Sequence, residues 1–391
     1  MRVLHWYPNF LGGGGVANAV LGLINSQARQ GLTLALAAMD RPGTPLYGPI
    51  RNQLADGIEL IEWRPTWTLR RGNLTWHGLP GAAGRKMQAW QPDLVHVHGE
   101  FNPDNLRVPR LLPGPLVLSN HGAFHPIVLE KSRAWQKRVY VAIARRRLYR
   151  RAVLHALTPM DAEYSARLVP GATVYLAPNG PSHQVAPFLG PATEAVARAD
   201  DRVRLLYVGR LDVQTKGLDL LLGAVAEVSR QLPSRRLHLT LVGPDWQGGR
   251  RVLEQLAVTL GITDRVEWAG TKLGPDLAEA YRACDLYVQC SRHEGQSITS
   301  TEALLTGKPA LLSENIALVS FPEVRDSDGV VLVAPTPATV AAGLLRAVTE
   351  LENLEQGAAH AWPAIHERFS WDRIVAAHLQ AYEELRASRR A

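Results

Sequence analysis

The sequence predicts an α/β protein with two domains, each built around a parallel sheet. Short runs rich in valine, leucine and isoleucine alternate with stretches of helical period, which is typical of strands buried between two layers of helices. This order occurs twice, separated by a connector rich in proline, alanine and glycine over residues 181–200. The length of 391 residues suits two or three such domains.

In the first half, the expected strands are RVLHWY, LTLALAAM, IELIEW, LVHVH, LVLSNH, LHALT and TVYLAPN. Between the first two, residues 16–30 place Val20, Leu23 and Ile24 at helical spacing, and Gly31 follows as a C-cap. We therefore expect a helix there.

In the second half, the expected strands are RLLYVG, HLTLVG, RVEWAG, LYVQCS, PALLSE and GVVLVA. The segments GLDLLLGAVAEVSRQL and RRVLEQLAVTLG predict helices between them. The C-terminal segment predicts a further helix, capped by Ser370. Its apolar positions are Ile374, Val375, Leu379, Tyr382 and Leu385.

The composition is that of a soluble globular protein, with 46% hydrophobic and 20% charged residues. No run reaches about 18 apolar residues, and the start MRVLHWYPNF lacks the features of a signal peptide, so we expect a cytoplasmic protein. Cys284 and Cys290 are expected to be reduced core residues. The net charge of +7 favours an anionic partner, which could be a nucleotide, a lipid surface or nucleic acid.

A run of glycines follows the first expected strand, in the segment YPNFLGGGGVANAV. Gly12, Gly14 and Ala17 fit a dinucleotide-binding pattern, and Asp40 ends the next strand, where a ribose-binding acid could stand. However, PNFL separates the strand from the glycines, and Asp40 lies 28 residues after Gly12 rather than about 20. The alternative is a turn that needs glycine only for close packing.

Two cations follow the first strand of the second half. Arg210 and Lys216 lie between that strand and a helix expected to begin near Gly217. Loops at strand ends bind ligands in open α/β sheets, and two cations beside a helix N-terminus suit a diphosphate. Solvated loop charges are the alternative.

A later strand is followed by Glu294, Gly295 and then a helix that contains Glu302. The glycine lets the backbone approach a ligand, the amides of residues 297–299 can donate to phosphate, and Glu302 can face ribose hydroxyls. The alternatives are helix capping with compensation of the helix dipole, and a pair of glycosidase carboxylates. An eight-residue offset spans up to about 12 Å, which fits two ends of one ligand better than a glycosidase pair.

Three histidines of the first half lie near the ends of expected strands. A metal site at His96, His98 and His121 is conceivable, but no acidic partner is evident nearby. His121 could instead donate a hydrogen bond to a substrate hydroxyl, or be a hydrogen-bonded core residue.

The segment KRVYVAIARRRLYRRA predicts a basic helix that either rests on anionic lipid or is solvated. Its apolar positions are Tyr140, Ile143, Leu148 and Tyr149. No recognised nucleic-acid motif accompanies the charge, so nucleic acid is not expected.

Taken in order along nearly the whole chain, these motifs resemble those of retaining glycosyltransferases of family 4. The motifs are Gly14-Gly15, DLVHVHG, NHG, APNG, VGRLDVQTKG, the Glu294 to Glu302 segment with EALLTGKP, FPEV with DGVVLV, and FSWDRIVAAHLQAYEEL. The resemblance implies a GT-B fold, in which two Rossmann-like, doubly wound domains face each other across a cleft. It further implies an acceptor-binding domain over residues 1–190, a domain for the nucleotide sugar over residues 191–370, and a terminal helix over residues 371–391 that crosses back.

The resemblance also implies residue roles. Arg210 and Lys216 match the basic pair that neutralises the diphosphate, Glu302 matches the ribose contact, and Glu294 matches the carboxylate on the donor sugar. His121 matches a histidine that hydrogen-bonds this sugar near the reacting carbon.

The remaining donor contacts are expected from backbone. Gln296, Ser297 and Ile298 contribute amides beside the sugar, and Gly14 and Gly15 form a wall of the cleft. The resemblance implies no metal and no cofactor other than the nucleotide sugar as co-substrate. Family members often have a bulky apolar residue and then Gly or Pro where this chain has Gln296-Ser297, so the identity of the sugar is open.

We therefore expect a retaining, metal-independent transfer of a hexose-type sugar to a sugar, lipid-linked or small-molecule acceptor, in bacterial glycoconjugate or polysaccharide synthesis. The alternatives are a non-hydrolysing sugar-nucleotide epimerase and a non-catalytic sugar-nucleotide-binding module. Epimerised sugar formed without acceptor would indicate the first, and tight binding without transfer or hydrolysis the second.

Overall fold

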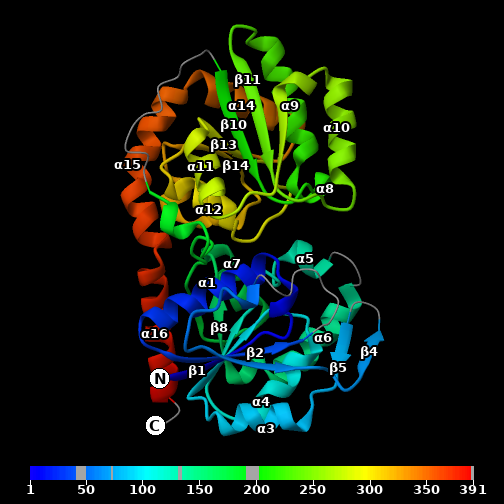
Figure 1. Cartoon of the computed structure of the whole chain (residues 1–391), viewed down its shortest axis with the longest axis vertical. Coiled ribbons are helices and arrows are strands. Elements are labelled where there is room, and N and C mark those ends of the chain that lie inside the picture. Colours follow the sequence, from blue (N-terminus) through cyan, green and yellow to red (C-terminus); the bar gives the residue numbers. More distant parts are fainter. Residues whose placement is uncertain (41–49, 72–73, 131–133, 191–201, 389–391) are drawn as a thin grey trace. The chain divides into compact units, whose positions relative to one another are not determined.

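A computed structural model describes residues 1–40, 50–71, 74–130, 134–190 and 202–388. The chain divides into two compact units (Figure 1), Met1–His183 with Trp371–Ala391, and Gln184–Ser370. The division thus falls after His183, whereas the sequence predicts a boundary after residue 190. Residues 191–200 of the expected connector lie outside the described residues.

The first unit contains a seven-stranded parallel sheet with the order β3-β2-β1-β6-β7-β8-β9. Its strands are β1 (Arg2–Trp6), β2 (Thr33–Met39), β3 (Glu59–Trp63), β6 (Leu94–His98), β7 (Leu116–Ser119), β8 (Ala152–Ala156) and β9 (Val174–Leu176). Each corresponds to one of the expected strands. The order reverses between β1 and β6, which makes this pair the topological switch point of the sheet.

The helices of this unit are α1 (Gly15–Arg29), α3 (Gly81–Ala89), α4 (Val108–Leu111), α5 (Pro126–Glu130), α6 (Ala134–Arg147), α7 (Pro159–Leu168) and α16 (Trp371–Ser388), with 3-10 turns η1 (Phe10–Gly12), η2 (Pro103–Arg107) and η3 (Tyr149–Arg151). An antiparallel hairpin, β4 (Thr68–Arg71) with β5 (Leu74–His77), was not expected. Its first strand is exposed throughout and has a single apolar residue, Leu69, so it lacks the apolar alternation that indicates a strand.

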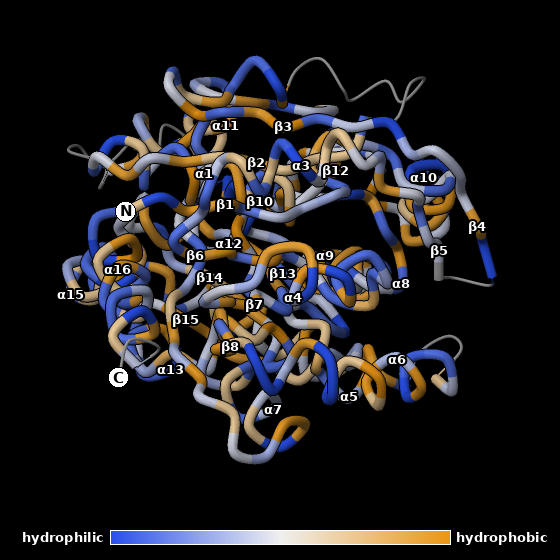
Figure 2. Tube along the Cα trace, turned by 90° about the horizontal axis from the view of Figure 1, so that it is seen from below, coloured by the Kyte–Doolittle hydropathy of each residue, from blue (hydrophilic) through white to orange (hydrophobic). Residues whose placement is uncertain are grey.

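Alternate residues of the first sheet face two separate apolar layers. Leu4 and Trp6 of β1 pack into the cluster that includes Met87 of α3 and Tyr140 of α6. The opposite layer contains residues of α1 and of α16. Figure 2 shows the chain coloured by hydropathy. The sheet is therefore covered on both faces, as the near-continuous apolar strands predict.

The C-terminal helix α16 is part of the first unit and packs against α1. Its first residue, Trp371, donates a hydrogen bond from Nε1 to the Pro181 carbonyl at 3.1 Å. A Cβ built on Gly22 or Gly180 would lie 2.4 or 2.5 Å from the Trp371 ring. Both glycines are thus required for the indole to reach its place.

The second unit contains a six-stranded parallel sheet with the order β12-β11-β10-β13-β14-β15. Its strands are β10 (Arg202–Val208), β11 (Arg236–Val242), β12 (Val266–Gly270), β13 (Leu286–Gln289), β14 (Ala310–Ser313) and β15 (Val330–Val333). Its helices are α8 (Val213–Lys216), α9 (Leu218–Gln231), α10 (Gly249–Leu260), α11 (Gly274–Ala283), α12 (Ile298–Leu305), α13 (Pro322–Arg325), α14 (Pro337–Thr349) and α15 (Leu351–Phe369), with 3-10 turns η4 (Ala186–Phe188), η5 (Thr263–Arg265) and η6 (Ala317–Ser320).

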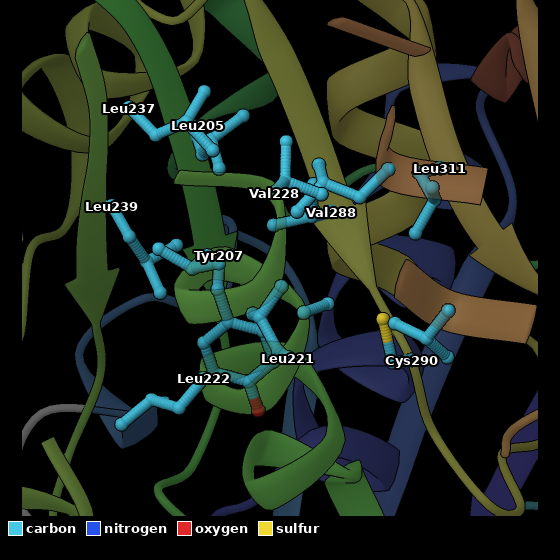
Figure 3. Packing of buried hydrophobic residues seen from close by; sticks show 14 of the residues in the cluster. Leu205, Tyr207, Leu221, Leu222, Val228, Leu237, Leu239, Val288, Cys290 and Leu311 are labelled. Carbon is cyan, nitrogen blue, oxygen red and sulfur yellow. The ribbon is translucent and has the colours of Figure 1, made fainter. Parts of the chain in front are cut away.

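This sheet is also buried on both faces. Leu205 and Tyr207 of β10 pack with Leu221 of α9 (Figure 3), whereas Leu206 and Val208 of the same strand pack toward α11 and α12. The prediction of two α/β domains with doubly covered parallel sheets is therefore confirmed.

Two further expectations concern the cysteines and the membrane. Cys284 and Cys290 are buried and free, which confirms the prediction of reduced core residues. Among the helices within the described ranges, none combines the length and apolar character that crossing a bilayer requires.

Candidate active site

In the second unit, the switch point lies between β10 and β13, where the strand order reverses. Ligands of open α/β sheets bind beyond the carboxyl ends of the strands at such points. The loop after β10 carries Arg210 and the loop after β13 carries Glu294. The fold therefore directs both predicted site segments to the same edge of one sheet.

Arg210 is exposed, and its guanidinium stacks on an aromatic ring. Its Cζ lies 4.1 Å from the ring centroid of Trp246. The Arg210 carbonyl accepts a hydrogen bond of 2.8 Å from the hydroxyl of Tyr207. The backbone of the residue is thus fixed from the strand beneath it, while the charged group stays accessible.

Lys216 forms an ion pair with Glu294, which is the closest association among the predicted site residues. Both side chains are mostly buried, with 12% and 22% of their surface exposed. The lysine ends the short helix α8, which is capped by Asp212 through the amide of Thr215 at 3.0 Å. The sequence predicted both residues for the site but not their direct contact.

Gly217 makes this approach possible. It adopts φ +63°, and a Cβ at this position would lie 2.0 Å from the Cys290 carbonyl oxygen. The turn between α8 and α9 therefore presses against the end of β13, which brings Lys216 to the Glu294 loop. A side chain at residue 217 would separate the two.

The Glu294 loop is joined to the neighbouring segment by backbone hydrogen bonds. The Glu294 amide donates to Asn315 at 3.1 Å, and its carbonyl accepts from Ala317 at 3.0 Å. Among the residues that the structure describes, none has an atom within 4 Å of a Cβ built on the next residue, Gly295. Open space beside a fixed backbone is what the close approach of a ligand needs.

The N-cap of α12 is Ser297, whose hydroxyl accepts from the Ser300 amide at 3.2 Å and donates to Gln289 Oε1 at 2.9 Å. Ser297, and not Glu294, therefore caps the helix. The helix geometry leaves the amides of Ile298 and Thr299 directed out of the helix start, where an anion is favoured.

Glu302 lies inside α12 with only 1% of its surface exposed. Its Oε2 accepts a hydrogen bond of 2.8 Å from the hydroxyl of Tyr281. A glycosidase pair needs two carboxyl groups that both face the scissile bond. Because Glu294 is paired with Lys216 and Glu302 is buried beside Tyr281, the geometry disfavours that alternative.

In the first unit, the glycine run follows β1 at the other switch point. The turn η1 separates the strand from α1, so the helix does not begin directly after the strand as in a dinucleotide site. Within the described residues, a Cβ on Gly12, Gly14 or Gly15 would meet no atom within 4 Å, so close packing against that part of the chain does not explain these glycines. A cavity of ≈ 240 Å³ opens beside Gly12 and Gly13.

The carboxylate proposed for a dinucleotide ribose is engaged elsewhere. Asp40 accepts a hydrogen bond of 2.7 Å from Arg64 Nε, with which it forms an ion pair. Together with the intervening turn, this pairing weakens the dinucleotide interpretation further.

Histidines gather beneath the same switch point. His5, His96 and His98 are buried, and one ring nitrogen of each lies within 4.8 Å of the others. His5, on the neighbouring strand β1, was not predicted, because the sequence does not show which strands pair. All six ring nitrogens of these three residues take part in hydrogen bonds, so a metal ion would have to displace them.

His121 follows β7 with φ +53°, a conformation uncommon for residues other than glycine. Its Nε2 lies 3.3 Å from Nδ1 of His98. His121 is half-buried, and desolvation of its ring by the surrounding protein lowers its pKa to about 3, so the ring is neutral at neutral pH. Strained conformations of this kind are concentrated at functional sites.

Glu100 is a second residue that the sequence prediction missed. It follows β6, and burial raises the pKa of its carboxyl group to about 7, so the group titrates near neutral pH. Its Oε2 is buried without a hydrogen-bond partner among the described residues. The signal was the acid of the segment HGE directly after a buried strand.

The basic helix differs from expectation in which apolar residues it exposes. Tyr140, Leu148 and Tyr149 are buried in the core, whereas Trp135, Val139 and Ile143 are 62%, 50% and 40% exposed. The last three are spaced four residues apart, so they form one stripe along α6. Figure 2 shows polar and apolar segments interleaved along this helix.

Comparison with known families gives matches in both halves of the chain. The family described as "Glycosyltransferase Family 4" matches residues 13–184, and that described as "Glycosyl transferases group 1" matches residues 202–350. A D-inositol 3-phosphate glycosyltransferase of Geodermatophilus obscurus is 36% identical over 200 residues, which cover 49% of this chain and 43% of the relative. One from Salinispora arenicola is 34% identical over 215 residues, covering 51% and 46%. The chain thus spans about half the length of these relatives.

Solved structures share the fold over almost the whole chain. Sucrose-phosphate synthase from Thermosynechococcus elongatus superposes with a TM-score of 0.76 at 20% identity, covering 99% of this chain and 100% of the other. Anabaena HepE in complex with UDP and glucose superposes with a TM-score of 0.74 at 17% identity, covering 98% and 100%. The two Rossmann-like units are those of the GT-B fold.

Proposed function

Since the chain belongs to the glycosyltransferases of family 4, we propose that it transfers a hexose-type sugar from a nucleotide diphosphate sugar to an acceptor, with retention of the anomeric configuration. The observation that carries this proposal is the ion pair of Lys216 with Glu294 at the switch point of the second unit, with Arg210 on the loop after the same strand β10. The nucleotide-binding neighbour HepE, which was solved with UDP, has the same fold.

In this mechanism, the diphosphate binds at Arg210 and Lys216. Both cations stabilise the negative charge that develops on the leaving diphosphate, a term that is usually the largest single contribution to catalysis. The two side chains supply this charge themselves, so the proposal requires no metal ion. Lys216 must exchange part of its contact with Glu294 for phosphate oxygens when the substrate binds.

The loop after β13 holds the sugar and the nucleoside. Glu294 accepts hydrogen bonds from sugar hydroxyls, and the backbone amides near Gln296, Ser297 and Ile298 lie beside the sugar and diphosphate. Glu302 binds the ribose hydroxyls, which requires that it turn from Tyr281 toward the ligand.

The first unit contributes the acceptor side and His121. Gly14 and Gly15 leave open backbone at the start of α1, where substrate can approach. The acceptor is a sugar, a lipid-linked sugar or a small molecule, and the process is bacterial glycoconjugate or polysaccharide synthesis. The D-inositol 3-phosphate glycosyltransferases support an acceptor of the polyol class.

A thermal-shift screen of UDP, GDP, ADP and dTDP sugars tests the proposal. The true substrate should raise the melting temperature with concentration, because stabilisation grows as the ratio of ligand concentration to dissociation constant. The stabilising sugar nucleotide is then incubated with and without candidate acceptors. Release of the nucleoside diphosphate is expected, and no stabilisation by any of them would contradict the proposal.

The same incubation separates the alternatives. An epimerised sugar nucleotide formed without acceptor indicates an epimerase. Tight binding with neither transfer nor hydrolysis indicates a binding module.

We also propose that α6 attaches the protein weakly to anionic membrane, which favours a lipid-linked acceptor and a place at the inner membrane face. The exposed stripe of Trp135, Val139 and Ile143 continues at its C-terminal end into the exposed Arg146 and Arg147. Apolar side chains that enter the headgroup region beside cations are what interfacial helices present.

A further inference from the structure

One chain of hydrogen bonds runs through the core of the first unit and ends at His121. Apart from the carbonyl at its start, the chain uses side chains only, and every member except His121 is buried. In order, the members are Ala177, His155, Ser119, His96, Tyr382, Gln27, His5, His98 and His121.

The direction of the first hydrogen bonds is fixed by Ala177. A carbonyl oxygen can only accept, so His155 Nε2, at 2.7 Å, carries a proton and donates it. In a neutral ring the other nitrogen then has a lone pair. The Ser119 hydroxyl, 2.5 Å away, must therefore donate to His155 Nδ1.

The same argument continues through His96 and Tyr382. With its only proton used, Ser119 Oγ accepts from His96 Nε2 at 2.6 Å. His96 Nδ1 is then an acceptor, so the Tyr382 hydroxyl donates to it at 2.6 Å. Tyr382 can accept but not donate a second time, and the amide NH2 of Gln27 donates to it at 3.1 Å.

The orientation of the Gln27 amide determines which ring nitrogen of His5, His98 and His121 carries the proton. Its Oε1 faces His5 Nε2 at 2.8 Å, so that nitrogen donates. His5 Nδ1 accepts from His98 Nε2 at 2.9 Å. His98 Nδ1 therefore accepts from His121 Nε2 at 3.3 Å, and the proton of His121 lies on Nε2.

The assignment requires neutral rings, and burial provides them. It lowers the pKa of His5 and of His155 to about 4, and the pKa values of His96 and His98 well below their ordinary value. Each ring thus holds one proton at neutral pH, as the chain of donors and acceptors demands.

We propose that this chain holds His121 in the tautomer protonated at Nε2, so that its Nδ1 accepts a hydrogen bond from a hydroxyl of the sugar substrate. The substrate class rests on the proposed function. His98, His5 and Tyr382 are positioning residues, because they act on the substrate only through His121. The sequence alone allowed His121 to donate a hydrogen bond to a substrate hydroxyl. The chain of hydrogen bonds instead uses the Nε2 proton toward His98 and leaves Nδ1 as an acceptor.

The chain does not carry protons to the substrate. Reversing every hydrogen bond would require the Ala177 carbonyl to donate, which it cannot do. The arrangement therefore sets one tautomer and excludes a relay to solvent through the core.

Nitrogen NMR of the full-length, ligand-free protein labelled with 15N-histidine tests the tautomer directly. The signals of His121 are identified by their loss in His121→Gln. We expect a protonated Nε2 and an unprotonated Nδ1 at pH 7.5. A proton on Nδ1 would overturn the proposal.

Tyr382→Phe tests the role of the chain. Without the Tyr382 hydroxyl, no hydrogen bond connects Gln27 to the part of the chain whose direction Ala177 fixes. The Gln27 amide can then rotate by 180°, which reverses the hydrogen bonds from Gln27 through His5 and His98. Two tautomers of His121 should then coexist, and equal populations would lower turnover about twofold. A single unchanged tautomer would show that the chain does not set it.

Tyr175→Phe is the matched control. It also removes one hydroxyl that contacts a buried histidine, His378 at 2.9 Å, but it lies outside the chain. We expect the His121 signals to stay as in the parent. If Tyr382→Phe does not fold, the spectrum of the parent protein still shows which nitrogen of His121 carries the proton. These spectra need no substrate. A protein that has the expected tautomer but transfers no sugar would therefore refute the proposed glycosyltransferase function and not the tautomer.

Discussion

The sequence identifies most of the candidate site residues, but it does not show which of them contact each other. Arg210, Lys216, Glu294 and Glu302 are all recognisable from the order of strand, charge and glycine. The Lys216 to Glu294 ion pair is not, because it joins residues 78 positions apart. His5 is similarly invisible, since its role depends on β1 lying beside β6.

Gly217 offers a residue-scale test of how the site is assembled. We expect Gly217→Ala to destabilise the protein by at least about 2 kcal/mol, since φ +63° is unfavourable for alanine and its Cβ would overlap the Cys290 carbonyl. Urea unfolding followed by circular dichroism measures the change.

The matched control is Gly223→Ala in the middle of α9. A Cβ there meets no atom of the described part of the chain within 4 Å, and in a helix interior alanine is more stable than glycine by roughly 0.5–1 kcal/mol. Equal stability of the two variants would show that the tight turn is not needed.

At the scale of elements, the sequence predicts what is apolar and periodic. The parallel strands of both sheets and helices α1, α9 and α16 were found because buried strands are almost continuously apolar and helices carry a stripe. The hairpin of β4 and β5 was missed because Thr68–Arg71 is exposed throughout and has only one apolar residue. In α6, the sequence alone could not show which of its apolar residues face the core.

The exposed stripe of α6 leads to a test with lipid vesicles. We expect co-sedimentation with anionic vesicles at low salt, weakened severalfold by Trp135→Ser with Ile143→Ser, because apolar insertion and charge act together. Salt should weaken binding as well.

Val252→Ser with Val258→Ser is the control pair. These residues of α10 are 55% and 67% exposed and lie outside the proposed patch. Their replacement should leave vesicle binding unchanged. Absence of binding by the parent protein would remove the membrane proposal.

For the whole molecule, the repeat of alternating strands and helices predicts two units but not the site at which the chain changes from one to the other. The first unit is completed by α16, 188 residues after His183, because Trp371 fits against Gly22 and Gly180. Each unit has one switch point, and the predicted nucleotide residues gather at that of the second. The opening glycines belong to the first.

The central claim is that Lys216 and Glu294 act on a bound nucleotide sugar, and the rate of nucleoside diphosphate release measures it most directly. With the sugar nucleotide found by thermal shift, Lys216→Ala and Glu294→Ala should each lower turnover at least roughly tenfold in folded protein. Arg250→Ala, which breaks the exposed Arg250 to Glu254 pair on α10, should keep the parent rate. Near-normal turnover in both site variants would contradict the account.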